Sequence, residues 1–460
     1  MRTDLEIEVL ESIRPGPVEA RRLQDISDLL IAKINDSGIA LGLLVGSFSR
    51  GTWIRGQHDL DIFLLFPPDT NREDLEEKGL KLARYVIADF TDEYYEKYAE
   101  HPYLHARIGD IKIDLVPCYN LKPGSPLISA VDRTPFHTKY VKERVDSLTD
   151  DILLLKQMMK VIGTYGSDQL TGGFSGYLCE ILVIYYNEFH SLLEAASHWK
   201  YGTLVDKEKH KSKSFSDPLI VIDPVDPKRN VASAVTIEKM SEFIEAARAY
   251  LVMPSRNFFI KFPNPKFSCS ELKLILNERG TELYIIRIKR PALIDEIIGP
   301  QMKRSTNAIT VLLQEHEFVV NRSAFAMNND ECIFIFEMMI DNLPAVRRHS
   351  GPSIFIEKNS LEFFRKYRKE RENVFSGPFI DGENYIVEVK RKFCTVSELI
   401  HSEKFLQIRH GKQIRNAISE GFSLTSSAKS FIPEFSDELY SFFHRSSPLL
   451  KIEQEDKEKK

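Results

Sequence analysis

Two aspartates in one short apolar segment are the first residues of this sequence that could perform chemistry. Asp59 and Asp61 lie two positions apart in HDLDIFLLFP (58–67), and alternate residues of a β-strand face the same side. Two carboxylates so close together repel each other, and an apolar sheet is a poor environment for them. Mg²⁺ would remove this conflict, because it prefers oxygen ligands and typically takes one or two carboxylates plus substrate phosphates. The pair therefore predicts a magnesium site.

A third carboxylate lies in a second apolar segment, IKIDLV (111–116). Alternation would place Asp114 and Lys112 on one face of this strand and the aliphatic side chains on the other. If the two strands are neighbours, Asp114 can join the first pair. Three carboxylates around two metal ions are the arrangement used for in-line phosphoryl or nucleotidyl transfer.

A Gly-Ser pair precedes the aspartates and could hold a phosphate. Gly46 lets backbone N–H groups approach a phosphate closely, Ser47 adds a hydroxyl, and Arg50 adds charge-assisted donors. Each feature alone is common, since Asp-x-Asp is usually a solvated surface pair and Gly-Ser is usually a turn. The combination of all of them in apolar strands favours a functional site.

The elements that must position these residues can be read from apolar spacing. For residues 36–120 the pattern indicates a helix packed on a small mixed sheet. The predicted elements of the first 120 residues are a helix over 18–35, strands over 38–46 and 58–67, a helix over 79–97, and a hairpin turn at 109–110 followed by a strand.

The rest of the chain reads as a helical region followed by an α/β region. Pro254–Pro265 holds three prolines and is expected to bridge the two. Residues 318–390 suggest an α/β sandwich. The predicted helices are 150–162, 177–196, 236–251, 299–316 and 361–371, and the predicted strands are 283–288, 318–326, 332–339 and 385–389.

Length and composition describe an ordinary globular protein of several domains. The chain has 460 residues, a net charge of −5, and five scattered cysteines without a CxxC pair, which supports neither a disulfide framework nor a cysteine zinc site. The sequence shows no signal peptide, and no apolar run approaches the ~18 residues of a membrane span. We therefore expect a cytoplasmic protein with no membrane partner.

The net charge hides a basic stretch. Residues 344–415 contain 15 Lys plus Arg against 9 Asp plus Glu, with aromatic residues interleaved. A charge run is often a solvated helix face, but this concentration in an otherwise acidic chain favours contact with RNA phosphates.

The motif string itself resembles a known family. GSFSRGTWIRGQHDLDIFLLFP (46–67) is similar to the archaeal (class I) CCA-adding tRNA nucleotidyltransferases, within the polymerase-β-type nucleotidyltransferase superfamily. The similarity continues through the segments DRTPFHTKYV (132–141), LLLKQMMKVIGTYGSD (153–168), GGFSGYLCEIL (172–182), DPVDPKRNVASAV (223–235) and GPQMKRSTNAI (299–309). Relatives often have Glu where this chain has Asp59; both are oxygen ligands, so metal binding is not put in doubt.

The resemblance implies a template-independent enzyme that adds C, C and A to the tRNA 3′ end from CTP and ATP. Asp59, Asp61 and Asp114 would then be catalytic and bind Mg²⁺. The resemblance also implies further binding residues. For the nucleotide these are Gly46, Ser47, Arg50, His137, Lys156, Tyr165 and Arg229, and near the growing 3′ end they are Glu100, His101 and Arg304.

We therefore predict an α+β multidomain protein. Its parts would be a polymerase-β-like catalytic head (1–145), a helical neck (146–257), an α/β body (258–316 and 391–460) and an inserted α/β sandwich tail (317–390). The resemblance implies that body and tail bind the tRNA acceptor–T arm and that the protein is a homodimer. Two alternatives remain: another template-independent polymerase, adding poly(A) or oligo(U), or a non-catalytic RNA-binding protein with this fold.

Overall fold

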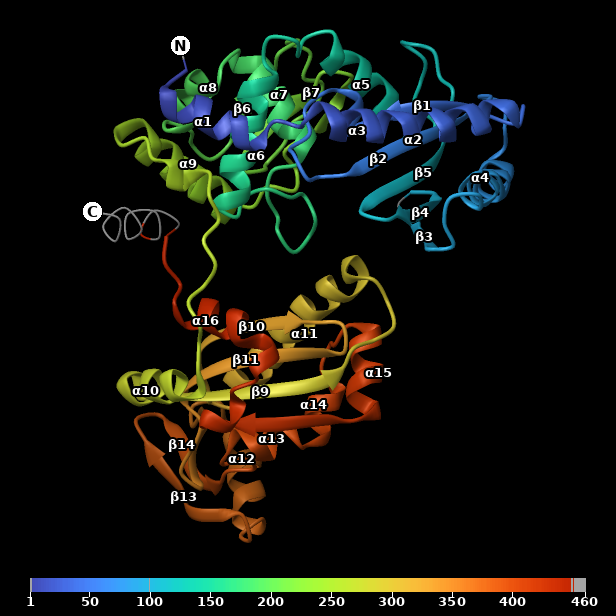
Figure 1. Ribbon diagram of the computed structural model, residues 1–460. Coiled ribbons are helices and arrows are strands. Elements are labelled where there is room, and N and C mark those ends of the chain that lie inside the picture. Colours follow the sequence, from blue (N-terminus) through green and yellow to red (C-terminus); the bar gives the residue numbers. More distant parts are fainter. Residues whose placement is uncertain (1, 99, 448–449, 451–460) are drawn as a thin grey trace. The chain divides into compact units, whose positions relative to one another are not determined.

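The computed structural model describes residues 2–98, 100–447 and 450. The chain forms two compact units, one running to Phe262 and resumed at Ser446, the other comprising Pro263–Arg445 (Figure 1). Within the described residues, no helix combines the length and the apolar character needed to cross a membrane.

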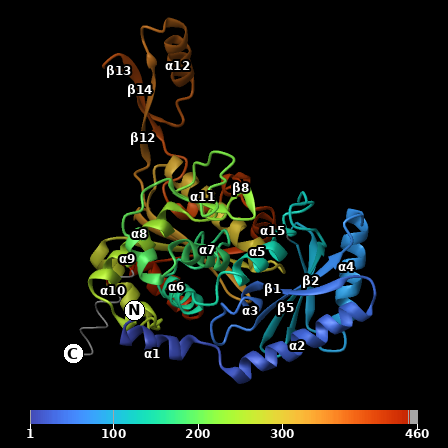
Figure 2. The same ribbon diagram turned by 90° about the horizontal axis from the view of Figure 1, so that it is seen from above.

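The first unit begins with a five-stranded mixed sheet, ordered β1-β2-β5-β4-β3. Strands β2 and β5 are parallel, and the other neighbours are antiparallel. Figure 2 shows β1, β2 and β5 side by side, with α2 and α4 nearby. The strands are β1 (Leu41–Val45), β2 (Asp59–Phe66), β3 (Tyr94–Tyr98), β4 (Pro102–Ile108) and β5 (Ile111–Tyr119), and the helices are α2 (Pro17–Asp36) and α4 (Arg72–Ile87).

The alternation of apolar and acidic residues along β2 determines which face of this sheet packs against the helices. Leu60, Ile62 and Leu64 are buried in one core cluster with apolar residues of α2 and α4. Asp59 and Asp61 alternate with them and therefore lie on the other face. The two helices thus cover the apolar face and leave the acidic face to the site.

The helix predicted over 79–97 differs from the structure. Helix α4 begins at Arg72, where the Asn71 side chain accepts the Asp74 N–H and caps the helix, and it ends at Ile87. The following YYEKY segment forms β3, which pairs with β4. Tyrosine favours strands, and an edge strand with few local signals is easily read as the end of a helix.

The rest of the first unit is mainly helical, with a small three-stranded sheet ordered β6-β7-β8. The predicted helix 177–196 divides in two at Asn187, which has a left-handed backbone (φ 64°). The helices are α1 (Asp4–Ile13), α3 (Gly46–Ser49), α5 (Arg133–Lys142), α6 (Thr149–Val161), α7 (Gly176–Tyr186), α8 (Phe189–Ala196), α9 (Ile237–Val252) and the 3₁₀ turn η1 (Arg256–Phe258), and the strands are β6 (Thr203–Val205), β7 (Leu219–Asp223) and β8 (Asp226–Asn230).

The second unit is built on a four-stranded sheet, ordered β10-β11-β9-β15, with core clusters on both faces. The strands are β9 (Glu282–Lys289), β10 (Val319–Met327), β11 (Glu331–Ile340) and β15 (Phe422–Ser426). The helices are α10 (Cys269–Arg279), α11 (Asp295–Glu315), α13 (Val396–Ile400), α14 (Glu403–Gln407), α15 (Lys412–Glu420), α16 (Ser436–Phe443) and the 3₁₀ turns η2 (Ser427–Ser430) and η3 (Pro433–Phe435).

A separate three-stranded sheet, ordered β12-β14-β13, packs with α12. Its elements are β12 (Val346–Ser353), α12 (Glu357–Lys369), β13 (Val374–Asp381) and β14 (Asn384–Lys390). Residues 318–390, expected as one sandwich, thus contribute to two sheets, because β11 pairs with β9 as well as with β10. The exact domain boundaries stay a prediction.

Candidate active site

The three predicted carboxylates lie on the same face of the five-stranded sheet, opposite the face that α2 and α4 cover. Asp61 lies directly opposite Asp114 in the parallel β2–β5 pair, and Asp59 lies opposite Lys112. Lys112 Nζ is 3.7 Å from Asp59 Oδ1. The condition set by the sequence, that the two acidic strands be neighbours, is therefore met.

The electrostatics of Asp61 show unbalanced negative charge at this point. Burial raises its pKa to about 6, the charges of Asp114 and Asp59 act in the same direction, and Arg50 opposes them. His105 Nδ1 is 2.5 Å from Asp114 Oδ1, so one of the carboxylates already has a partner. A cation beside Asp61 would relieve the repulsion.

Gly46 is required where the loop meets these acids. Its φ is +74°, and a Cβ at this position would lie 1.9 Å from Asp61 Oδ2. Ser47 follows in the short helix α3, where its carbonyl accepts the N–H groups of Arg50 and Thr52 at 3.2 and 3.0 Å. Gly46 therefore packs its backbone directly against the Asp61 carboxylate.

A buried carboxylate, Glu180, links two predicted nucleotide-binding residues. Glu180 is fully buried on α7, 3.0 Å from Arg50 Nε and 3.0 Å from Lys156 Nζ. Lys156 is 2% exposed and also donates to the carbonyl and hydroxyl oxygens of Thr52 at 2.9 and 3.2 Å. The Thr52 hydroxyl donates to Glu180. All three donors of Lys156 therefore have partners within the protein.

A second buried carboxylate, Asp223, contacts two more predicted nucleotide-binding residues, His137 and Arg229. Arg229 Nη1 donates to Asp223 Oδ2 at 2.6 Å, and His137 Nε2 lies 2.9 Å from the same oxygen. Tyr177 stacks on the His137 ring with centroids 4.0 Å apart and donates to Asp223 Oδ1 at 3.3 Å. Burial raises the pKa of Asp223, but His137 and Arg229 outweigh this effect and lower it to about 2. Burial lowers the pKa of His137.

Tyr165 lies close to the Lys156 cluster. A Cβ on Gly176 would lie 2.8 Å from the Tyr165 hydroxyl and 3.7 Å from Lys156 Nζ, so a glycine is needed for this approach. The Lys160 ammonium lies 5.1 Å from the Tyr165 ring centroid. Burial lowers the pKa of Lys160 to about 8, Lys156 adds to this effect, and Asp59 opposes it.

The predicted RNA-contacting residues come from both units. Glu100 is exposed, and its carboxylate accepts the Ala130 N–H. His101 is only 3% exposed, with Nδ1 3.4 Å from Glu76 Oε1. Arg304 is exposed on α11 in the second unit. Glu100 and His101 therefore belong to the first unit, as the carboxylates do, and Arg304 belongs to the second.

Sequence reasoning missed Glu180, Asp223 and His105. A signal for the first two existed, because Glu180 stands among apolar residues in LCEILV (178–183) and Asp223 ends the apolar run LIVI (219–222). A lone acid in an apolar element is costly unless it is paired. His105 had no such signal, because only the pairing of β4 with β5 brings it to Asp114.

The donor set suits a hard divalent cation that is completed by substrate. Within the described part of the chain, no group of three or more His, Cys, Asp or Glu side chains stands ready to hold a metal ion by itself. Carboxylates at Asp61 and Asp114, with further oxygen ligands from substrate phosphates, fit Mg²⁺.

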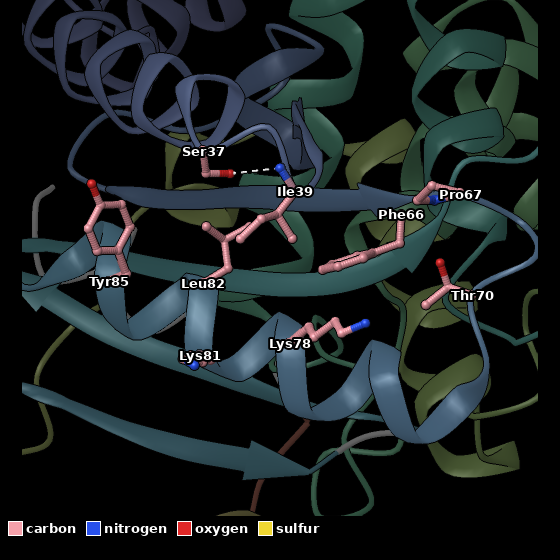
Figure 3. A pocket seen from close by; sticks show the side chains of 9 residues that line it. All are labelled: Ser37, Ile39, Phe66, Pro67, Thr70, Lys78, Lys81, Leu82 and Tyr85. Carbon is pink, nitrogen blue, oxygen red and sulfur yellow. Dashed lines mark hydrogen bonds between the residues drawn. The ribbon is translucent and has the colours of Figure 1, made fainter.

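A separate hollow of about 740 Å³ lies on the helix-covered face of the same sheet (Figure 3). It contains none of the predicted site residues. Its lining residues are Ser37, Ile39, Phe66, Pro67, Thr70, Lys78, Lys81, Leu82 and Tyr85.

Comparisons with known proteins agree with this arrangement. Three family models match in succession: a nucleotidyltransferase domain (30–137), the second domain of tRNA nucleotidyltransferase (150–260) and the C-terminal domain of CCA-adding enzyme (279–427). The chain is 44% identical over 443 residues to the CCA-adding enzyme of Methanoregula boonei, covering 96% of both chains.

The chain belongs to the CCA-adding enzyme family. The family's enzyme from Methanosarcina acetivorans is 36% identical over 432 residues, covering 93% of this chain and 94% of that enzyme. Among solved structures, a cytoplasmic RNA terminal U-transferase has a TM-score of 0.44 at 16% identity, covering 56% of this chain and 98% of that chain. Family membership confirms the resemblance and the predicted multidomain fold with a nucleotidyltransferase head.

Proposed function

We propose that this protein adds C, C and A in turn to the 3′ end of tRNA, using CTP and ATP. One observation carries the proposal: Asp61 and Asp114 lie opposite each other on neighbouring strands, with Gly46 packed against Asp61. Family membership over 96% of the chain supports tRNA, CTP and ATP as the substrates of this site.

The proposed reaction is an attack of the tRNA 3′ oxygen on the α-phosphorus of the nucleotide. A new O–P bond forms, the bond to the bridging oxygen breaks, and pyrophosphate leaves. Asp114 would orient the attacking hydroxyl and help to remove its proton. Asp59, Asp61 and Asp114 would hold Mg²⁺, which, when bound, supplies stabilisation of the attacking and leaving oxygens.

The nucleotide would lie between the carboxylates and the two buried acids. We assign Ser47, Arg50 and Tyr165 to the triphosphate side. Lys156, whose three donors are engaged by Thr52 and Glu180, would serve the triphosphate through its charge and by holding Glu180. His137 would also serve the triphosphate, and Arg229 the base. Glu180 and Asp223 support this assignment because each fixes an arginine whose remaining donors can face a ligand.

The second unit would hold the rest of the tRNA. Its basic stretch at 344–415 supports binding of the acceptor–T arm through phosphate contacts. Glu100, His101 and Arg304 would lie near the growing 3′ end. The division into head (1–145), neck (146–257), body (258–316, 391–460) and tail (317–390), a homodimeric state and a cytoplasmic location belong to the same proposal.

Asp61→Ala tests the function directly. We expect it to abolish incorporation of labelled CTP and ATP into tRNA lacking its 3′ CCA, while tRNA binding stays nearly unchanged. Asp89→Ala is a suitable control, because among the described residues Asp89 pairs only with Lys33, at the surface, and it should retain activity. Near-normal incorporation by Asp61→Ala would refute the site assignment.

The product distinguishes the alternatives. Addition that stops after the A supports CCA synthesis, whereas a long homopolymer indicates a poly(A) or oligo(U) polymerase. Absence of any Mg²⁺-dependent incorporation by the unmodified protein would indicate a non-catalytic RNA-binding protein.

A further inference from the structure

A row of side chains continues from the carboxylates across the sheet, away from the Gly-Ser loop. His105 lies opposite Asp114 in the β4–β5 pair, and Tyr95 lies opposite His105 in the β3–β4 pair. Residues directly opposite each other in a sheet point to the same face. Asp61, Asp114, His105 and Tyr95 therefore form one line on the face opposite α2 and α4.

A parallel row of charged residues runs beside this line. Arg107 lies opposite Lys112, which in turn lies opposite Asp59. Arg107 is exposed, and within the residues that the structure describes its guanidinium takes part in no ion pair. Lys112 is half exposed and only loosely paired with Asp59 at 3.7 Å. Two cations therefore lie beside the row, Arg107 next to His105 on β4 and Lys112 next to Asp114 on β5.

The end of the row is hollowed. A pocket of about 520 Å³ is lined by Tyr95, His105, Arg107 and Lys112, together with Tyr94 and two acids of the preceding loop. The Tyr95 side chain is 46% exposed, and its ring centroid lies 5.1 Å from that of His105. An exposed ring beside arginine and lysine at a pocket is the combination that binds single-stranded nucleic acid.

The two sides of the carboxylate pair are chemically different. Strand β1, on one side of β2, leads into Gly46, Ser47 and Arg50, which we assign to the triphosphate. Strands β4 and β3 lie on the other side of β5 and carry the aromatic and basic rows. An in-line transfer needs its attacking and leaving groups on opposite sides of the reacting phosphorus, and the acids stand between these two sides.

We propose that the pocket formed by Tyr95, Arg107 and Lys112 binds the 3′-terminal nucleotide of the RNA before each addition. This inference rests on the proposed function. The base stacks on Tyr95, and the phosphate contacts Arg107 and Lys112. The base and ribose together then span the roughly 10 Å between β3 and β5, two strand spacings, so that the 3′ hydroxyl reaches Asp114.

Steady-state kinetics of Tyr95→Ala test the pocket. Loss of one stacked base corresponds to about a 5- to 150-fold fall in kcat/KM for tRNA lacking CCA, with KM for CTP unchanged. Tyr95→Phe keeps the ring and should match the unmodified protein. Tyr85→Ala removes another exposed tyrosine, 60% exposed, from α4 on the helix-covered face, and should also match it.

Two outcomes would overturn the proposal while leaving the CCA-adding activity intact. One is a Tyr95→Ala protein whose kcat/KM for tRNA equals that of Tyr85→Ala. The other is a Tyr95→Phe protein as impaired as Tyr95→Ala, since the ring would then not be the binding element. Failure of the proposed function itself differs, because the unmodified protein would then incorporate no CMP.

A measurement on the unmodified full chain avoids any folding defect of a variant. We expect tRNA lacking CCA and carrying 4-thiouridine at its last nucleotide to form a photo-crosslink to the segment that contains Tyr94 and Tyr95. Crosslinks confined to other segments would overturn the proposal.

Discussion

Replacing Glu180 by Gln tests whether one buried carboxylate organises the nucleotide side of the site. The substitution preserves the shape of the side chain and removes its charge. Arg50 and Lys156, each 3.0 Å from the carboxylate, lose their ionic partner, and the Thr52 hydroxyl loses a charged acceptor. Because all of these groups are buried, water cannot take the place of the lost charge.

The size of the effect follows from this burial. Removing one partner of a buried ion pair costs about 3–5 kcal/mol, because it leaves an uncompensated charge. For a unit of this size we expect melting of the first unit to fall by about 6–20 °C. Lys156 retains the two Thr52 oxygens, which favours the lower part of this range.

The pH dependence of this loss has a definite sign. Burial raises the pKa of Glu180, but Lys156 and Arg50 outweigh it and hold the pKa below the ordinary 4.5. A carboxylate with a lowered pKa in the folded state stabilises the protein above its unfolded pKa and ceases to do so as pH falls below it. The difference between the two proteins should therefore be full at pH 7 and shrink below about pH 4.5.

The assay combines calorimetry with CTP kinetics at a temperature where both proteins are folded. We expect KM for CTP to rise about tenfold, as for loss of one well-placed charged hydrogen bond, because Arg50 is no longer fixed. Glu337→Gln is a matched control: Glu337 is also fully buried and paired with Arg279 and Arg322, but lies in the second unit. It should destabilise that unit and leave KM for CTP unchanged.

The result that would refute the reasoning is equally specific. If Glu180→Gln melts and binds CTP as the unmodified protein does, the carboxylate is not the organising group. If Glu337→Gln raises KM for CTP by the same factor, the kinetic effect reports general destabilisation and not the geometry of Arg50.

Two further predictions concern the carboxylates. Gly46→Ala should reduce incorporation at least about 100-fold, because the new Cβ would displace the Asp61 carboxylate. Gly38→Ala is the control: Gly38 has a similar φ and open space around it, so this variant should lose stability but keep activity. Equal activity of the two variants would contradict the prediction. Asp61→Asn in Mg²⁺-free buffer should raise the melting temperature at pH 7, since ionising a group whose pKa has risen from 3.8 to about 6 costs on the order of 3 kcal/mol. Because the carboxyl pKa is raised in the folded state, the gain in melting temperature should grow as pH rises from about 4 to 6 and vanish below about pH 4. Calorimetry over that range that shows no pH-dependent gain would contradict the prediction.

The elements that carry the acids could be predicted because their signals are local. Alternation in 58–67 and 111–116 assigns Asp59, Asp61 and Asp114 to one face of their strands, and the structure agrees. The strand β3 was missed because YYEKY continues a helical stretch without a clear stop, and it becomes a strand by pairing with β4. The strands β10 and β11 were predicted, but their place in one sheet with β9 was not, because β9, which pairs with β11, lies more than 30 residues earlier.

The supporting residues could not be predicted, because their roles depend on which distant elements become neighbours. Glu180 gains its role only when the fold brings α7 next to Arg50 and Lys156. His105 gains its role only when β4 pairs with β5. An acid inside an apolar segment indicates that a buried cationic side chain must pair with it, but the sequence does not identify that side chain. The catalytic carboxylates can be found in the sequence because they would repel each other without a cation. The residues that hold them show only that a buried acid needs a partner. A search for lone acids in apolar helices and strands would therefore have found Glu180 and Asp223 as candidates, and the fold alone supplies the arginines that complete them.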